Sequence, residues 1–218
     1  MSNSEYLKRN AAPPSWRIDR KIRAYISKPN PGAHPLDRAL PIGNVLKQLG
    51  VAKVAREIKK AMLANEIIVD GRRVTDPRFA VGLFDTIEIP VMKQAFLISI
   101  DLKGRIVINP TKDTKHKPCK ITGKHLVPGG KMQLNLIDGR NILVAKDSYK
   151  VGDTLVLGIP KQDITKHLKL ESGAKALITS GRYVGHTVKV TSVEGSMVKF
   201  AVNDTTSETH KEHTYVIP

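Results

Sequence analysis

The sequence has a single cysteine, Cys119, among its 218 residues, so no intramolecular disulfide can form and a reducing compartment fits. Aromatic residues make up only 5% of the chain, and we therefore expect neither a large aromatic core nor an aromatic platform for stacking nucleic-acid bases. No apolar run approaches the roughly 20 residues that span a bilayer. The N-terminal residues also lack the apolar segment of a signal peptide, so we expect a soluble, cytoplasmic protein without a membrane partner.

The short motifs of common enzyme sites are also missing. The chain has no Gly-x-Ser-x-Gly elbow, Walker loop, dinucleotide-binding glycine pattern or His-Glu-x-x-His. One cysteine is too few for the paired ligands of a typical structural zinc site, although His116 and His125 flank it. We therefore expect no enzyme activity, no catalytic residue, no cofactor, no metal and no small-molecule substrate.

Acidic residues are outnumbered, with 20 Asp and Glu against 36 Lys and Arg and a net charge of +16. Such a balance favours an anionic partner such as nucleic acid. The charge is uneven, because residues 91–170 carry a net +9 and residues 1–40 a net +5, whereas residues 41–90 carry +2 and residues 171–218 carry zero. The middle segment is thus the strongest polyanion candidate by charge alone.

The most informative stretch is residues 51–89. Its apolar spacing predicts a helix over about residues 51–65, with one buried stripe formed by Val54, Ala55, Ile58, Ala61 and Met62. Lys53, Arg56 and Lys60 fall on the opposite side, within about 60° of one another. A charged helix face is often only solvated, and for a lone helix that alternative stays open.

A basic turn follows this helix. Asp70-Gly71 after an apolar run predicts a tight hairpin turn, and Arg72 and Arg73 come directly after it. Arg78 lies a few residues further on. A basic helix face beside a basic turn suits a row of backbone phosphates, so the recurrence of cations favours RNA binding.

These residues resemble the S4 domain, an RNA-binding fold. The resemblance is carried by residues 52–56, 69–72, 77, 81–82 and 85–87. It implies a second helix that packs on the first, and we expect that helix to have Pro41 at its first position and to stop at Gly50. It also implies that the basic helix face and the turn bind structured RNA. The unit is expected over residues 41–91.

Residues 1–40 precede this unit and contain five prolines, which argue against continuous helix or central strand. Such a basic segment buries little by itself and is expected to order only against a partner, although Trp16 needs something to pack on. Its motifs resemble the N-terminal extension of ribosomal protein family S4e of archaeal and eukaryotic small subunits: residues 7–9, 11–13, 15–16, 31–32 and 34–36. The resemblance continues down the whole chain.

From Gln94 the apolar period changes from 3.6 to two. Hairpins are predicted at 96–108 and 132–144, and further strands at 154–157 and 164–170. We expect residues 92–170 to form a small antiparallel, barrel-like domain with basic loops.

We expect residues 171–218 to form a second small barrel. Gly181 and Gly185 bracket a loop that resembles the KOW motif, in which glycine lets the backbone approach a partner closely. An ordinary β-turn remains the alternative for this loop.

The resulting expectation is an α+β chain with a basic extended N-terminus, a small helical S4-type unit and two small antiparallel β-barrel-like domains. The resemblance implies a structural constituent of the small ribosomal subunit that binds rRNA and neighbouring ribosomal proteins. The alternatives are a non-ribosomal RNA-binding chaperone and an RNA-modification factor that carries an S4-type module. The candidate RNA contacts are Lys53, Arg56, Lys60, Arg72, Arg73, Arg78, Arg17, Arg20, Lys21, Arg23, Lys112, Lys115, Lys117 and Arg182.

Overall fold

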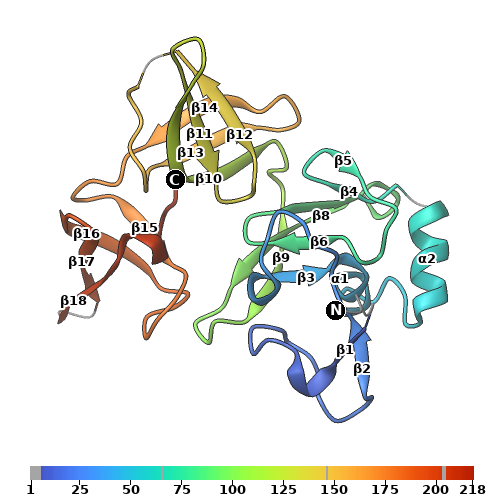
Figure 1. Cartoon of the computed structure of the whole chain (residues 1–218). Coiled ribbons are helices and arrows are strands. Elements are labelled where there is room, and N and C mark those ends of the chain that lie inside the picture. The colour runs from blue at the N-terminus through green and yellow to red at the C-terminus, as the bar shows by residue number, and fades with distance from the viewer. Residues whose placement is uncertain (1–5, 65, 146, 203–204) are drawn as a thin grey trace. The chain divides into compact units, whose positions relative to one another are not determined.

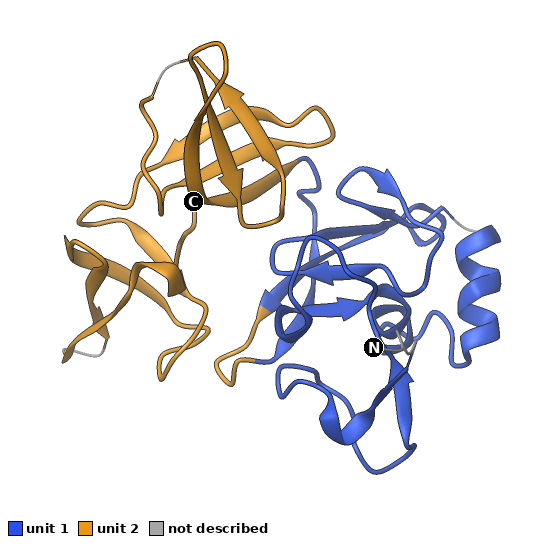
Figure 2. Cartoon of the chain, viewed as in Figure 1, with its two compact units in different colours: residues 1–99, 105–115 blue, residues 100–104, 116–218 orange. Residues whose placement is uncertain are grey.

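The computed structural model describes residues 6–64, 66–145, 147–202 and 205–218. The chain forms two compact units, one of residues 1–99 and 105–115 and the other of residues 100–104 and 116–218 (Figure 2). Helices are few and antiparallel strands are many, so the predicted α+β class is confirmed. No helix in the described ranges is long and apolar enough to cross a membrane.

The first unit is built on a five-stranded sheet in the order β5-β4-β7-β8-β9 (Figure 1). Its strands are β4 (Ile68–Val69), β5 (Arg72–Arg73), β7 (Thr86–Ile89), β8 (Gln94–Ile100) and β9 (Ile106–Thr111). The hairpin of β8 and β9 was expected to begin the central domain at residue 92, but β8 pairs with β7. The reason is burial, because Ile98 and Ile106 enter the same core as Ile87.

Two helices, α1 (Ile42–Gln48) and α2 (Ala55–Ala64), contribute buried residues to the same core as this sheet. The first turn of α1 is tied to a neighbouring loop, since the backbone N–H of Ile42 donates to the Phe79 carbonyl at 2.8 Å and that of Gly43 to the Pro77 carbonyl at 2.9 Å. These bonds satisfy N–H groups that a helix start leaves without an intrahelical partner. Just before α1, β3 (Ala39–Pro41) pairs with β6 (Ala80–Gly82).

Helix α2 begins later than predicted. The carboxylate of Glu57 accepts hydrogen bonds from the backbone N–H groups of Lys53 and Val54, at 2.9 and 3.1 Å. Residues 51–54 therefore form the approach to the helix rather than its first turn, as in a capping box. Val54, expected in the buried stripe, is 53% exposed, while Ile58 and Met62 are buried as predicted. The predicted last helical residue, Asn65, lies outside the described residues.

The N-terminal segment folds onto the first unit. Strands β1 (Tyr6–Lys8) and β2 (Tyr25–Ser27) pair. The segment also contains two short 3-10 helices, η1 (Arg9–Ala11) and η2 (Leu36–Arg38). Trp16 is buried in the core of this unit, and the neighbouring Ser15 carbonyl accepts a hydrogen bond from the backbone N–H of Ile106. The expectation that this segment orders only against a partner is wrong, because the chain's own core receives Trp16.

The second unit contains a sheet in the order β12-β11-β10-β13-β14. Its strands are β10 (His116–Val127), β11 (Lys131–Leu136), β12 (Asn141–Val144), β13 (Thr154–Gly158) and β14 (Asp163–Leu168). The predicted hairpin around Asp138-Gly139 is confirmed, with Leu134 opposite Ile142. A register shift in β10 between Ile121 and Gly123 bends the longest strand of this sheet.

A second sheet of this unit has the order β18-β17-β16-β15-β19. Its strands are β15 (Lys175–Ile178), β16 (Thr187–Glu194), β17 (Met197–Val202), β18 (Thr205–His210) and β19 (Thr214–Val216). The C-terminal strand, which was expected to close this sheet, joins it at the edge beside β15, where Leu177 pairs with Tyr215. Strand β18 was not predicted, since its sequence TTSETH has no apolar residue to reveal a period of two.

Two residues join β10 to the C-terminal segment. The Tyr215 hydroxyl donates to the Pro118 carbonyl at 2.6 Å and accepts from the backbone N–H of Lys120 at 3.1 Å. The buried ammonium of Lys120 donates to the carbonyls of Lys211 and Glu212, at 2.7 and 2.8 Å. A buried cation is thus held by carbonyl oxygens near the end of the chain.

Candidate nucleic-acid interface

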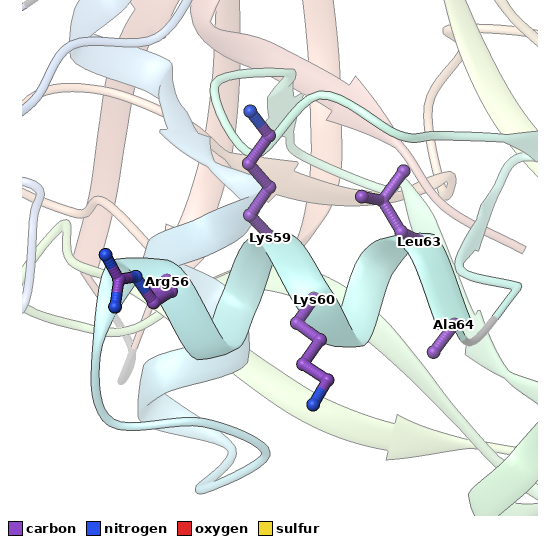
Figure 3. A pocket seen from close by; sticks show the side chains of 5 residues that line it. All are labelled: Arg56, Lys59, Lys60, Leu63 and Ala64. Carbon is purple, nitrogen blue, oxygen red and sulfur yellow. The ribbon is translucent and has the colours of Figure 1, made fainter.

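The exposed face of α2 carries three cations. Arg56, Lys59 and Lys60 are exposed and line a shallow hollow together with Leu63 and Ala64. Figure 3 shows Lys59 and Leu63 projecting from one side of the helix and Lys60 and Ala64 from the other, with Arg56 in the first turn. Lys59 was missed by sequence reasoning, although its spacing of three residues from Arg56 could have revealed it.

The predicted turn after α2 is confirmed by backbone geometry. Asp70 and Gly71 both have positive φ, 48° and 71°, as a two-residue type I′ hairpin turn requires. The Asp70 carboxylate accepts hydrogen bonds from the backbone N–H and the hydroxyl of Thr86, at 3.0 and 3.2 Å. The turn is therefore fixed to β7, and Arg72 and Arg73 stand exposed in β5 just after it.

The carboxylates of this stretch are engaged locally. Glu57 caps α2, and its pKa is lowered chiefly by the hydrogen bond from the backbone N–H of Lys53 and then by that from Val54. Glu66 lies 3.7 Å from the Arg73 guanidinium, an exposed pair that places β5 beside the segment following α2. Within the described part of the chain, no ion pair is formed by the remaining cations of the helix and turn: Arg56, Lys59, Lys60 and Arg72. The helix face and the turn thus present positive charge to solvent.

Lys53 and Arg78 stand apart from this array. Lys53 is exposed but precedes α2, so it does not share the helix face on which it was predicted. Arg78 is half-buried in the loop before β6, and its guanidinium donates to the Asn30 side-chain oxygen. Asn30 in turn donates to the Asp76 carboxylate at 2.6 Å, so Arg78 helps to hold the N-terminal segment in place.

The predicted cations of the N-terminal segment also differ in exposure. Arg17, Lys21 and Arg23 are exposed, as an RNA contact requires. Arg20 is half-buried and donates to two backbone carbonyls, those of Asn10 and Pro13, both at 3.1 Å. Its role is therefore to shape the segment rather than to reach a partner.

Lys47 on α1 is a cation that the sequence did not single out. Its pKa is lowered, first by burial and then by the charges of Arg23 and Arg9. Positive charges therefore crowd together where the N-terminal segment meets the last turn of α1. No spacing rule links these positions, because only the fold brings them together.

Three cations were predicted in a loop at residues 112–117. Lys112 and Lys115 are exposed there, but the prediction that Lys117 is an exposed loop cation is wrong. Lys117 lies in β10 with its side chain only 3% exposed, and its ammonium is 3.4 Å from the Asp138 carboxylate. The Arg140 guanidinium lies 3.2 Å from the same oxygen, which also accepts from the Cys119 thiol at 3.3 Å. Lys117 is thus part of a buried polar cluster and cannot contact RNA.

Arg182 lies exposed in the glycine-bracketed loop of the second unit. Gly181 and Gly185 have φ of 91° and 79°, a conformation that side-chain-bearing residues rarely adopt. The Arg182 guanidinium sits 5.8 Å from the centre of the Tyr183 ring. The described residues contain no group of three or more His, Cys, Asp or Glu that could hold a metal ion.

Family models of known proteins match three successive parts of this chain. The family model described as S4 domain matches residues 41–87, the RS4NT (NUC023) domain matches residues 1–37, and Ribosomal family S4e matches residues 92–164. The protein named small ribosomal subunit protein eS4 of Methanococcus aeolicus is 41% identical over 199 residues, which cover 87% of this chain and 82% of that protein. The chain belongs to ribosomal family S4e.

Further similarities agree with the S4e assignment. The eS4 protein of Methanocaldococcus jannaschii is 40% identical over 198 residues, 87% of this chain and 81% of that protein. The crystal structure of 30S ribosomal protein S4e from Thermoplasma acidophilum matches with a TM-score of 0.70 and 29% identity, covering 83% of this chain and 94% of that one. The S4e resemblance stated from the sequence is therefore confirmed, and the cationic array of α2 and β5 falls within the residues matched as an S4 domain.

Proposed function

We propose that this S4e-family chain is a structural protein of the small ribosomal subunit, located on cytoplasmic ribosomes, and that it binds rRNA without catalysing a reaction. The observation that carries the proposal is the cationic array of α2 and β5 in the S4 domain, in which Arg56, Lys59, Lys60 and Arg72 form no ion pair within the described residues. Relatives that cover most of this chain are named small ribosomal subunit proteins, which supports the same assignment.

The mechanism is binding to phosphate. Each Lys or Arg that neutralises a phosphate releases condensed counterions, which drives association and makes it depend on salt. A rigid helix face followed by a hairpin fixed through Asp70 offers these charges at set positions, so a folded RNA of matching shape binds better than an arbitrary one. Arg56, Lys59, Lys60 and Arg72 are the contacts proposed at the centre of this surface.

Further cations extend the proposed surface. The exposed side chains in this set are Lys53, Arg73, Arg17, Lys21, Arg23, Lys112, Lys115 and Arg182. The segment 171–218 carries no net charge, so neighbouring ribosomal proteins are its proposed partners rather than RNA alone.

Crosslinking of the chain to RNA in a gradient-fractionated cell lysate tests the proposal. We expect crosslinks between peptides of α2 and β5 and small-subunit rRNA, in the small-subunit and whole-ribosome fractions. Crosslinks mainly to tRNA or to free RNA at the top of the gradient would instead support a chaperone or an RNA-modification factor.

A further inference from the structure

The N-terminal hairpin brings two tyrosines onto one exposed face. Strands β1 and β2 lie side by side (Figure 1), and in their pairing Tyr6 lies opposite Ser27 and Lys8 lies opposite Tyr25. Side chains alternate along a strand, so both tyrosines and Lys8 share one face of the hairpin. The Tyr6 and Tyr25 side chains are 61% and 56% exposed.

The opposite face of the hairpin anchors it. Ile26 is buried in the core of the first unit, and Leu7 packs against the same core. Arg9 extends the pairing, since its backbone N–H donates to the Ala24 carbonyl at 2.9 Å. The two rings are therefore presented to solvent on a platform that the fold itself holds in place.

The surroundings of the two rings are strongly basic. Residues 6–28 include seven Lys or Arg and a single acidic residue, Asp19. Lys8 lies on the same face, directly opposite Tyr25, and Lys21 and Arg23 are exposed in the connection that leads to β2. The pKa of Lys47 on α1 is lowered chiefly by burial, and the positive charges of Arg23 and Arg9 add to the shift, which places these three cations near one another.

We propose that the Tyr6 and Tyr25 face stacks unpaired bases of RNA, with Lys8 and the neighbouring cations on the adjoining phosphates. Aromatic rings beside cations form the usual platform for single-stranded nucleic acid, because every base offers a π face and carries a phosphate. A protein partner would have to supply both apolar surface and several carboxylates here. Each nucleotide of a single RNA strand supplies a base that can stack on a ring and a phosphate that can pair with a cation. The inference rests on the proposed rRNA binding and adds an unpaired segment to what is bound.

Sequence reasoning did not predict this pair of rings, because aromatic residues make up only 5% of the chain. Tyr6 and Tyr25 are 19 residues apart in sequence, and neither lies in an aromatic motif. Only the register of β1 and β2 places them diagonally on the same face. The platform also differs in kind from α2, whose cations contact phosphates and do not select unpaired bases.

The test measures the affinity of the full chain for three RNA probes over one common series of salt concentrations. The probes are an oligouridylate of about 12 nucleotides, the same oligomer with abasic sites in place of its bases, and a duplex of equal length. The variants are Tyr6→Ala with Tyr25→Ala, the ring-preserving pair Tyr6→Phe with Tyr25→Phe, and Ile22→Ala. The last is a matched control, because Ile22 is 68% exposed in the same segment and has no ring.

We expect the double alanine variant to bind oligouridylate about tenfold more weakly per ring lost, with an unchanged salt slope because no charge is removed. Duplex binding should be unchanged, and the phenylalanine pair and the Ile22 variant should bind as the unaltered chain does. The unaltered chain should also prefer intact oligouridylate to the abasic strand. This comparison needs no protein variant, so it stands even where a substitution perturbs folding.

Equal binding of intact and abasic strands would overturn the stacking proposal, and so would alanine variants that bind oligouridylate normally. If those variants bind RNA normally but associate less with small-subunit proteins, the face belongs to a protein contact and the proposal fails. The proposed function survives in each of these cases as long as the unaltered chain crosslinks to small-subunit rRNA. A chain that binds none of the three probes would overturn the stacking proposal, and one that also fails to crosslink to small-subunit rRNA would overturn the proposed function as well.

Discussion

The imidazole Nε2 of His34 lies 3.1 and 3.0 Å from the two carboxylate oxygens of Asp85, and the side chains are only 7% and 5% exposed. One of these oxygens also accepts a 2.8 Å hydrogen bond from the backbone N–H of Gly82. The pair joins residues 51 positions apart, one in the N-terminal segment and the other just before β7. It is a second reason, besides Trp16, why that segment is part of the first unit.

Gly82 leaves the room that this pair needs. A Cβ added there would lie 2.6 Å from the Nδ1 and Cδ2 atoms of the His34 ring, which its bonds to Asp85 hold in place. We expect Gly82→Ala to displace the ring and to lower the free energy of unfolding by about 1–3 kcal/mol. Denaturant unfolding measures the change.

Gly32→Ala is the matched control for this substitution. A Cβ at Gly32 would meet the nearest atom at 3.7 Å, an ordinary contact. The variant should change the free energy of unfolding by less than about 0.5 kcal/mol. Equal changes in the free energy of unfolding at Gly32 and Gly82 would show that the His34 ring moves aside at little cost. Its bonds to Asp85 would then not fix its position.

Replacing Arg72 and Arg73 together by Ala should weaken RNA binding and flatten its salt dependence. Each phosphate contact contributes about 0.7–0.9 to the slope of log K against log salt, so the slope should fall by about 1.4–1.8. The measurement is affinity for small-subunit rRNA over a salt series.

The control for the arginine pair removes the same charge elsewhere. Lys175 and Lys189 lie opposite each other in β15 and β16, and both are exposed. Their joint replacement by Ala should leave the salt slope close to that of the unaltered chain. An unchanged slope in the Arg72 and Arg73 variant would remove the β5 turn from the contact surface.

The cap of α2 should weaken in acid. The pKa of Glu57 is lowered by the hydrogen bonds from Lys53 and Val54, so the cap is fully present above the ordinary glutamate pKa. It is lost as pH falls through the lowered pKa, because the protonated carboxyl accepts less strongly. The amide chemical shifts of Lys53 and Val54 should titrate with a midpoint below the ordinary value.

Glu57→Gln separates this effect from general acid unfolding. Its amide oxygen still accepts hydrogen bonds but does not titrate in this range. The same two amide signals should therefore lose their acid step in the variant. A midpoint at or above the ordinary glutamate value in the unaltered chain would contradict the cap.

Cys119 should be inert in the folded chain. Burial raises the pKa of its thiol well above the ordinary value, and the negative charge of Asp138 and its hydrogen bond add to the shift against the opposing charges of Lys117 and Arg140. Since the thiolate is the reactive form, alkylation near pH 8 should be slower than in denaturant by about tenfold or more. As the single cysteine of the chain, it gives an unambiguous signal by mass spectrometry, and equal rates in both conditions would show that the buried cluster opens.

Local signals in the sequence were accurate where one physical rule decides. Asp70-Gly71 predicted its turn because few residue pairs accept positive φ twice, and Asp138-Gly139 marked the next clear hairpin. The positions of Ile58 and Met62 predicted the buried side of α2. Motif order along the chain also sufficed to place it in family S4e, since that order does not depend on knowing which strands pair.

The sequence by itself determined the two tight turns, the burial of Ile58 and Met62 in α2, the basic charge and the family, because each is encoded in neighbouring residues or in composition. The tertiary structure alone decided which cations face solvent. Lys117 and Lys112 look alike in sequence, yet Lys117 is buried against Asp138 because its strand places it inside the second unit. The fold likewise decided that Tyr6 and Tyr25 share one face of a hairpin and that His34 pairs with Asp85, since the placement of distant residues depends on strand pairing and packing that no local pattern records.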